Sequence, residues 1–153
     1  MIKIEHTLFS LPFVLSASLL AIIYQGYDFN NWQNFFWIVL ALFSARSAGM
    51  TLNRLIDSKI DAKNPRTAQR EIPQGVISKQ IALIFSIITI LLLIFSALQL
   101  PLICIQLSPI ALIWLFAYSF LKRVTWLCHF FLGTTLGGAT YAGWIAITGT
   151  SFS

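Results

Sequence analysis

Asn53, Asp57 and Asp61 carry side-chain oxygens at four-residue intervals near the middle of the chain. Residues four apart lie on one face of an α-helix, so this spacing predicts a single polar stripe. Two carboxylates at that spacing repel each other by roughly 0.2–0.5 kcal/mol in water, and a membrane environment increases the cost. A cation between them would relieve the repulsion. Because all the candidate ligands are oxygens, we expect Mg²⁺ that keeps several waters and bridges to substrate phosphates.

A basic stretch, KNPRTAQREIPQG, follows this stripe. Its arginines, Arg66 and Arg70, present planar guanidinium groups that suit phosphate oxygens. We therefore interpret them as clamps for the phosphates that the ion would hold. A second interpretation stays open, in which they only contribute to the positive charge that cytoplasmic loops of membrane proteins carry.

The composition is that of an integral membrane protein. The chain has 153 residues, of which 58% are hydrophobic and only 10% are charged, which is outside the usual range of soluble domains. The formal net charge of +5 would suggest nucleic-acid binding in a soluble protein. Here the basic residues flank apolar segments and no nucleic-acid-binding motif is present, so we expect a lipid bilayer and no nucleic acid as partner.

The apolar segments predict an all-α, polytopic transmembrane bundle that forms one unit over residues 1–153. A span needs about 20 residues, and five segments meet this requirement or nearly do: 7–25, 32–52, 80–99, 102–121 and 125–148. A tight hairpin is expected at Pro101, between the third and fourth spans. Three glycines in the last span (Gly133, Gly137 and Gly138) predict close helix packing, although such space could also admit a substrate ring.

The basic residues also predict the orientation. When five spans alternate, nine of the ten fall on one side: Lys3, Arg54, Lys59, Lys63, Arg66, Arg70, Lys79, Lys122 and Arg123. The positive-inside rule assigns that side to the cytoplasm. We therefore expect a multi-pass protein of the cell inner (cytoplasmic) membrane whose polar site faces the cytoplasm.

The tenth basic residue, Arg46, lies inside the second apolar segment. It precedes Asn53 by seven residues, and two helical turns place it on the same stripe. An arginine within a membrane span costs about 2.5–3.5 kcal/mol on insertion scales unless it is paired. We expect an anionic partner inside the bundle, although the side chain could also reach the cytoplasmic interface.

The predicted Mg²⁺ ion and the basic side chains could assist a reaction in which diphosphate is the leaving group. Its charge must be neutralised as it leaves, which Mg²⁺, arginine and lysine achieve without covalent catalysis. If the diphosphate is attached to an allylic isoprenoid, its departure leaves a carbocation, and an apolar bundle would protect this cation from water. The segments at 80–99 and 102–121 could line the space for the lipid tail.

Several segments resemble the UbiA superfamily of membrane prenyltransferases. NRLIDSKIDAKNPRTAQREIPQG is similar to that family's first Asp-rich motif, and YSFLKR, residues 118–123, to its Y-x-x-x-K element. IEHTLFSLPF, ARSAGMTLNR and WLCHFFLGTTLGGATYAGWIAITG are also similar to family members, so the resemblance covers essentially the whole chain. It is strongest to the bacterial quinone-pathway branch, 4-hydroxybenzoate polyprenyltransferases and their menaquinone-pathway relatives.

The resemblance implies an Mg²⁺-dependent enzyme that transfers a polyprenyl group from polyprenyl diphosphate to an aromatic acid in ubiquinone or menaquinone biosynthesis. The acceptor would be 4-hydroxybenzoate or a dihydroxynaphthoate. In this role Asn53, Asp57 and Asp61 would bind the metal and, through it, the diphosphate. Arg66 and Arg70 would contact the diphosphate from the loop.

Three further residues follow from the same resemblance. Lys122 would meet the diphosphate from the end of the fourth span, with Tyr118 one turn earlier on the same face. Arg46 matches an arginine that lines the family's polar pocket. Arg54 is a departure, because many members have aspartate after the motif asparagine. It leaves the metal stripe intact but could alter the local field.

The family also predicts what this chain lacks. Members have about nine transmembrane helices and a second Asp-rich motif in the later half, whereas nothing acidic follows Glu71 here. We therefore expect an amino-terminal half that is inactive alone, with a carboxy-terminal half elsewhere. Two alternatives remain: a small transporter or channel subunit whose charged stripe forms an ion path, and a non-catalytic half of a split prenyltransferase.

Overall fold

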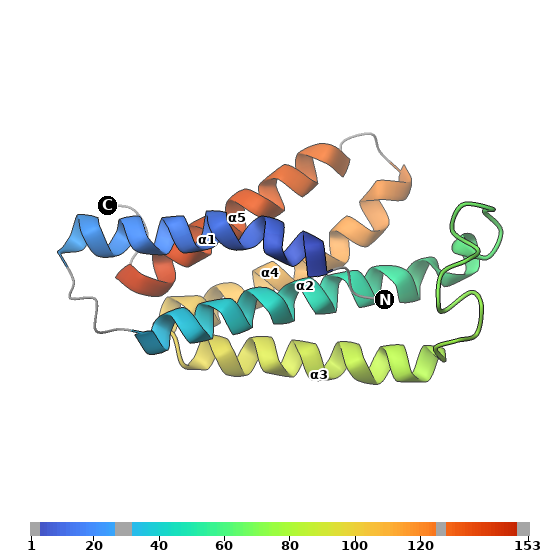
Figure 1. The fold of residues 1–153 in the computed structure, drawn as a ribbon, viewed down its shortest axis with the longest axis horizontal. Coiled ribbons are helices and arrows are strands. Elements are labelled where there is room, and N and C mark those ends of the chain that lie inside the picture. The colour runs from blue at the N-terminus through green and yellow to red at the C-terminus, as the bar shows by residue number, and fades with distance from the viewer. Residues whose placement is uncertain (1–3, 27–31, 125–127, 150–153) are drawn as a thin grey trace.

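The protein is a bundle of five long helices, seen in a computed structural model that describes residues 4–26, 32–124 and 128–149. The helices are α1 (Ile4–Gln25), α2 (Trp32–Asp61), α3 (Lys79–Leu98), α4 (Leu102–Val124) and α5 (Cys128–Thr148). No strand occurs in these described ranges, so the all-α prediction is confirmed. The helices run up and down the long axis of the molecule (Figure 1).

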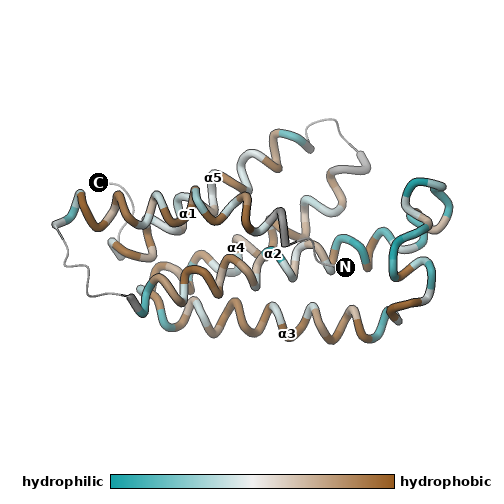
Figure 2. The backbone as a smooth tube through the Cα atoms, in the orientation of Figure 1, coloured by the Kyte–Doolittle hydropathy of each residue, from teal (hydrophilic) through white to brown (hydrophobic). Residues whose placement is uncertain are grey.

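All five helices are long and apolar enough to cross a membrane. Figure 2 shows hydrophobic residues along the helices and a concentration of hydrophilic ones in the loop after α2. Helix α2 extends beyond the predicted apolar segment 32–52 and continues to Asp61, as the spacing of the polar stripe requires. Residues 53–61 contain neither glycine nor proline, so nothing in them ends the helix. This extension carries the polar stripe.

The helix ends alternate as the sequence predicts. The start of α1, the end of α2, the start of α3 and the end of α4 all lie toward one end of the molecule (Figure 1). The predicted hairpin at Pro101 is confirmed, with α3 ending at Leu98 and α4 beginning at Leu102. The Gln99 N–H donates to the Ser96 carbonyl at 3.2 Å, and the Cys104 N–H donates to the Pro101 carbonyl at 2.8 Å.

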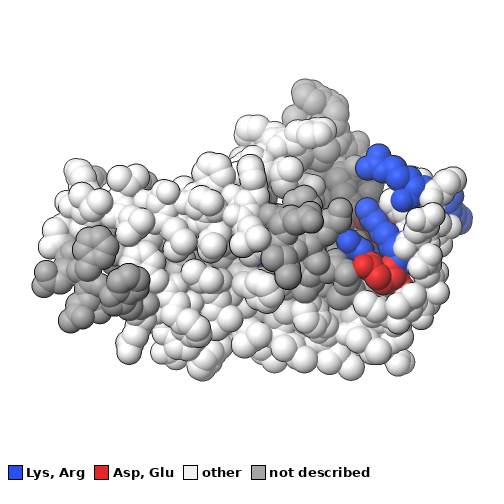
Figure 3. Space-filling view, in the orientation of Figure 1, with Lys and Arg blue, Asp and Glu red and all other residues white. Residues whose placement is uncertain are grey.

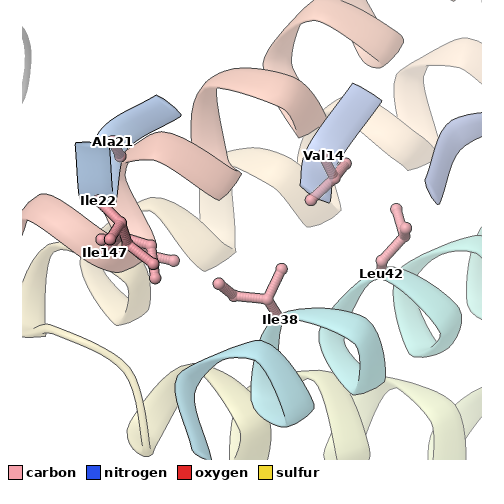
Figure 4. Packing of buried hydrophobic residues seen from close by; sticks show 7 residues of the cluster. Val14, Ala21, Ile22, Ile38, Leu42 and Ile147 are labelled. Carbon is pink, nitrogen blue, oxygen red and sulfur yellow. The ribbon is translucent and has the colours of Figure 1, made fainter. Parts of the chain in front are cut away.

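An apolar core joins α1, α2 and α5 (Figure 4). Its buried members are Val14, Ala21, Ile22, Ile38, Leu42, Ala146 and Ile147. The backbones of α1 and α5 approach closely, because the Ser18 hydroxyl donates to the Gly143 carbonyl at 3.0 Å. A Cβ atom at Gly143 would lie 2.7 Å from the Val14 carbonyl oxygen, so this contact requires glycine.

The glycine stripe does not make the close contact that the sequence predicts. A Cβ at Gly133, Gly137 or Gly138 would meet no described atom within 4 Å. Small-residue spacing on one helix says nothing about which of its faces a neighbour covers. The close approach of α5 occurs instead at Gly143, one turn or more beyond the stripe.

Small polar residues make the seam between α2 and α3. The rings of Trp37 and Phe95 lie 5.6 Å apart across this seam. Ser44 is two turns after Trp37, and it shares a face of α2 with Ser47 and Thr51. All three hydroxyl residues are 0% exposed. Small side chains on the face of α2 that carries Trp37 allow a neighbouring helix to approach closely.

Candidate functional site

Helix α2 positions the predicted polar stripe. Arg46, Asn53, Asp57 and Asp61 all lie within it, and their spacing places them on one side, drifting slowly around the axis. Asp57 and Asp61 are each only 6% exposed, while Arg46 and Asn53 are half-buried. Two carboxylates buried within one turn of each other are costly unless positive charge is close by.

Arg70 supplies such a charge. Its Nη1 donates to Oδ2 of Asp61 at 2.7 Å, and the two side chains are 38% and 9% exposed. A charge-assisted hydrogen bond of this kind is stronger than one between neutral groups. The structure thus brings one predicted phosphate-binding arginine to one predicted metal ligand. Arg66 is exposed on the same loop, and its role at a phosphate stays a prediction.

The loop that carries these arginines folds compactly against the end of α2. The Thr67 hydroxyl donates to the Asp61 carbonyl at 3.1 Å, and the Ile77 N–H donates to the Glu71 carbonyl at 3.1 Å. Ile72 is buried at 6% exposure. Gly75 has φ +75°, a backbone conformation that glycine adopts without strain. These contacts give the loop a defined shape and attach it to the end of α2.

A second ion pair, between Arg54 and Glu71, was missed by the sequence reasoning. Arg54 Nη1 donates to Glu71 Oε2 from α2 to the loop. The two residues are 17 apart in sequence, so no helical or strand period links them. The sequence shows that Arg54 stands where many family members have aspartate, but it does not indicate the partner of this arginine. Charged side chains gather over this end of the molecule (Figure 3).

The residues predicted on α4 are placed less fully. Tyr118 is half-buried on that helix. Lys122 belongs to the same helix, but its side chain lies outside the described residues. Their contact with a diphosphate stays a prediction.

An apolar cavity of about 430 Å³ lies between the helices. All five helices contribute to its wall, including Ile38 and Ala45 of α2, Leu93 of α3 and Trp114 of α4. The wall also includes Thr135, whose hydroxyl accepts a hydrogen bond from Trp114 Nε1 at 3.1 Å. The segments predicted to line the tail space, 80–99 and 102–121, both contribute to this wall, together with α1, α2 and α5. Binding of the lipid tail there stays a prediction. The volume of the cavity is in the range of ligand pockets.

The oxygen atoms of the stripe suit a Mg²⁺ ion whose remaining coordination positions would be filled by water and substrate oxygens. No group of three or more His, Cys, Asp or Glu side chains that could hold a metal occurs within the described ranges. Mg²⁺ in proteins is commonly held by one or two carboxylates, with waters and substrate phosphates filling its other positions. Asp57 and Asp61, with the Asn53 amide, match this smaller set. The cationic guanidinium on Asp61 shows that positive charge is accommodated there.

A model of the UbiA prenyltransferase family matches residues 13–153. The chain belongs to this family. Its fold agrees, because the apo structure of a UbiA homolog from Aeropyrum pernix K1 superposes with a TM-score of 0.88 at 33% sequence identity. That match covers 100% of this chain and 54% of the other.

Curated UbiA-type relatives include 4-hydroxybenzoate octaprenyltransferases. The protein of that name from Aliivibrio fischeri (strain MJ11) is 36% identical over 109 residues, which are 71% of this chain and 38% of the relative. The one from Vibrio parahaemolyticus is 31% identical over 129 residues, 84% of this chain and 45% of the relative. The matched residues thus cover less than half the length of these two curated relatives.

Proposed function

We propose that this chain forms the diphosphate-binding part of a membrane prenyltransferase, which moves a polyprenyl group from polyprenyl diphosphate to an aromatic acid. The observation that carries this proposal is the pair of buried carboxylates on α2, Asp57 and Asp61, with Arg70 already bound to the second. Family membership supports prenyl transfer. The names of the relatives favour 4-hydroxybenzoate as acceptor.

In this function Asn53, Asp57 and Asp61 would hold Mg²⁺ through oxygen atoms. When bound, the ion supplies positive charge to the diphosphate as it departs. Arg70 adds a guanidinium from the loop, and Lys122 would approach from the end of α4. These groups stabilise charge that develops on the leaving oxygens, which is the largest contribution that a protein makes to such reactions.

The transfer is an electrophilic substitution. The bond between the allylic carbon and the diphosphate oxygen breaks, and its electron pair leaves with the diphosphate. The allylic cation is captured by a ring carbon of the electron-rich acceptor, and the ring then loses a proton. The apolar cavity bordered by Ile38, Leu93 and Trp114 offers the prenyl chain an apolar lining. Such a lining would keep water away from the cation.

The site would face the cytoplasm from the inner membrane. The basic residues of the loop after α2, with those at the end of α4, follow the positive-inside pattern. The helix directions support this proposal, since the end of α2 and the end of α4 lie toward the same end of the bundle (Figure 1).

The test uses the full-length protein in membranes with labelled polyprenyl diphosphate and 4-hydroxybenzoate. Asp57→Asn and Asp61→Asn should each lower kcat about 10²–10³-fold, as expected when a transition-state charge stabiliser is lost. Asp28→Asn makes the same chemical change in the connection between the first two spans, and it should leave turnover unchanged. Normal turnover in both Asp57 and Asp61 variants would remove the stripe from the mechanism.

A further inference from the structure

Two ion pairs join the loop to α2, and they are nested in sequence, with Arg54–Glu71 enclosing Asp61–Arg70. Arg54 and Asp61 are seven residues apart, so they lie about 10 Å apart along the helix axis. Their partners, Glu71 and Arg70, are consecutive in the loop. The two neighbouring loop side chains therefore reach in opposite directions along α2 and hold the loop at two points.

The order of the charged residues on α2 and on the loop favours a single alignment of the loop with the helix. Arg54 on the helix meets Glu71, and Asp61 meets Arg70. If the loop were displaced so that the partners exchanged, arginine would face arginine and glutamate would face aspartate. Like charges placed together in this way disfavour the wrong arrangement. The pairing thus determines where Arg70 stands relative to the carboxylate stripe.

The Arg54–Glu71 pair is shielded and is separate from the loop's own folding. Its side chains are 17% and 33% exposed, less than in the surface pairs that contribute little. The loop is closed independently by backbone hydrogen bonds, such as Gln74 N–H to the Arg70 carbonyl at 3.1 Å, and by burial of Ile72. Loss of the pair would therefore remove one attachment of the loop to α2 and loosen its orientation without unfolding it.

We propose that Arg54 and Glu71 are a positioning pair, which holds the loop so that Arg70 is presented to the carboxylate stripe and to the incoming diphosphate. The proposal rests on the proposed function. Neither residue touches the substrate in this scheme. They act through Arg70. Arg54, which stands where many family members have aspartate, would thus have a positioning role in this site.

The first experiment measures binding without turnover. The full-length protein in detergent is titrated calorimetrically with inorganic diphosphate in the presence of Mg²⁺. Arg54→Gln and Glu71→Gln should each weaken binding about fivefold, the loss expected for a partly shielded ion pair. The double variant should lose less than the sum of the two single losses, because the Arg54–Glu71 contact is broken in all three. Lys59→Gln removes an exposed cation from the same helix and should change nothing.

The second experiment separates positioning from chemistry. In the prenyl-transfer assay both variants should raise KM for polyprenyl diphosphate about fivefold and change kcat less than about twofold. Amide hydrogen exchange at Gln74 and Ile77 should match the unaltered protein, which shows that the loop remains folded. Arg54→Lys keeps the charge and should retain affinity within about twofold.

Several results would overturn the proposal. These are independent, additive losses in the double variant, an Arg54→Lys loss as large as that of Arg54→Gln, and unchanged diphosphate affinity. If the Asp57 and Asp61 variants lose turnover while Arg54 and Glu71 variants bind normally, only the positioning pair is wrong. If the Asp57 and Asp61 variants keep turnover, the proposed function itself fails.

Discussion

The guanidinium of Arg70 lies 2.7 Å from the carboxylate of Asp61, so a loop residue and a helix residue meet at the place proposed for metal and diphosphate. Arg70 thus supplies positive charge beside the buried carboxylate of Asp61.

This geometry predicts that Arg70 contributes more than Arg66 to binding of polyprenyl diphosphate. Arg70→Gln should raise KM for polyprenyl diphosphate roughly tenfold, because a charge-assisted hydrogen bond contributes about 1.5 kcal/mol or more. Arg66→Gln should have a smaller effect, since Arg66 is exposed. Steady-state kinetics of the full-length protein measures both. An Arg66 effect equal to or larger than that of Arg70 would contradict the ranking.

The orientation in the membrane can be tested with exposed positions at opposite ends of the bundle. Gln74 lies in the loop after α2 and Gln99 in the α3–α4 hairpin, and both are exposed. In a protein whose own cysteines, Cys104 and Cys128, are replaced, Gln99→Cys should react with an impermeant thiol reagent in intact cells. Gln74→Cys should react only after the cells are opened. The reverse pattern would invert the orientation.

The close contact of α1 with α5 predicts a position that tolerates no side chain. Gly143→Ala should lower stability by about 1–3 kcal/mol, since its Cβ would meet the Val14 carbonyl and overpacking costs that much. Gly137→Ala is the control on the same helix, where a Cβ meets no described atom within 4 Å. Thermal unfolding in detergent compares them. Equal melting temperatures for the two variants would argue against this contact.

The α2–α3 seam offers a second stability test at one residue. Ser47 is fully buried, and its hydroxyl has no hydrogen-bond partner among the described residues. Ser47→Ala should therefore match or exceed the unaltered protein, because an unpaired buried hydroxyl is lost. Ser47→Leu should destabilise by about 1–3 kcal/mol through overpacking. A stable Ser47→Leu protein would mean that the seam is looser than the structure indicates.

Much of this molecule follows from local pattern. Apolar runs of sufficient length predicted the five helices, and Pro101 predicted the hairpin, because span length and chain reversal depend on neighbouring residues. The four-residue spacing of Asn53, Asp57 and Asp61 predicted one polar stripe, since helix periodicity determines which residues share a face.

Tertiary structure alone decided what those faces meet. The partner of Arg54 proved to be Glu71, the close approach of α5 lies at Gly143 and not in the glycine stripe, and all five helices together line the apolar cavity. Each of these contacts joins segments that are distant in sequence, and no periodicity relates them. A helix determines the direction of its own side chains, but its neighbours and their rotation about the helix axis result from the packing of the whole bundle.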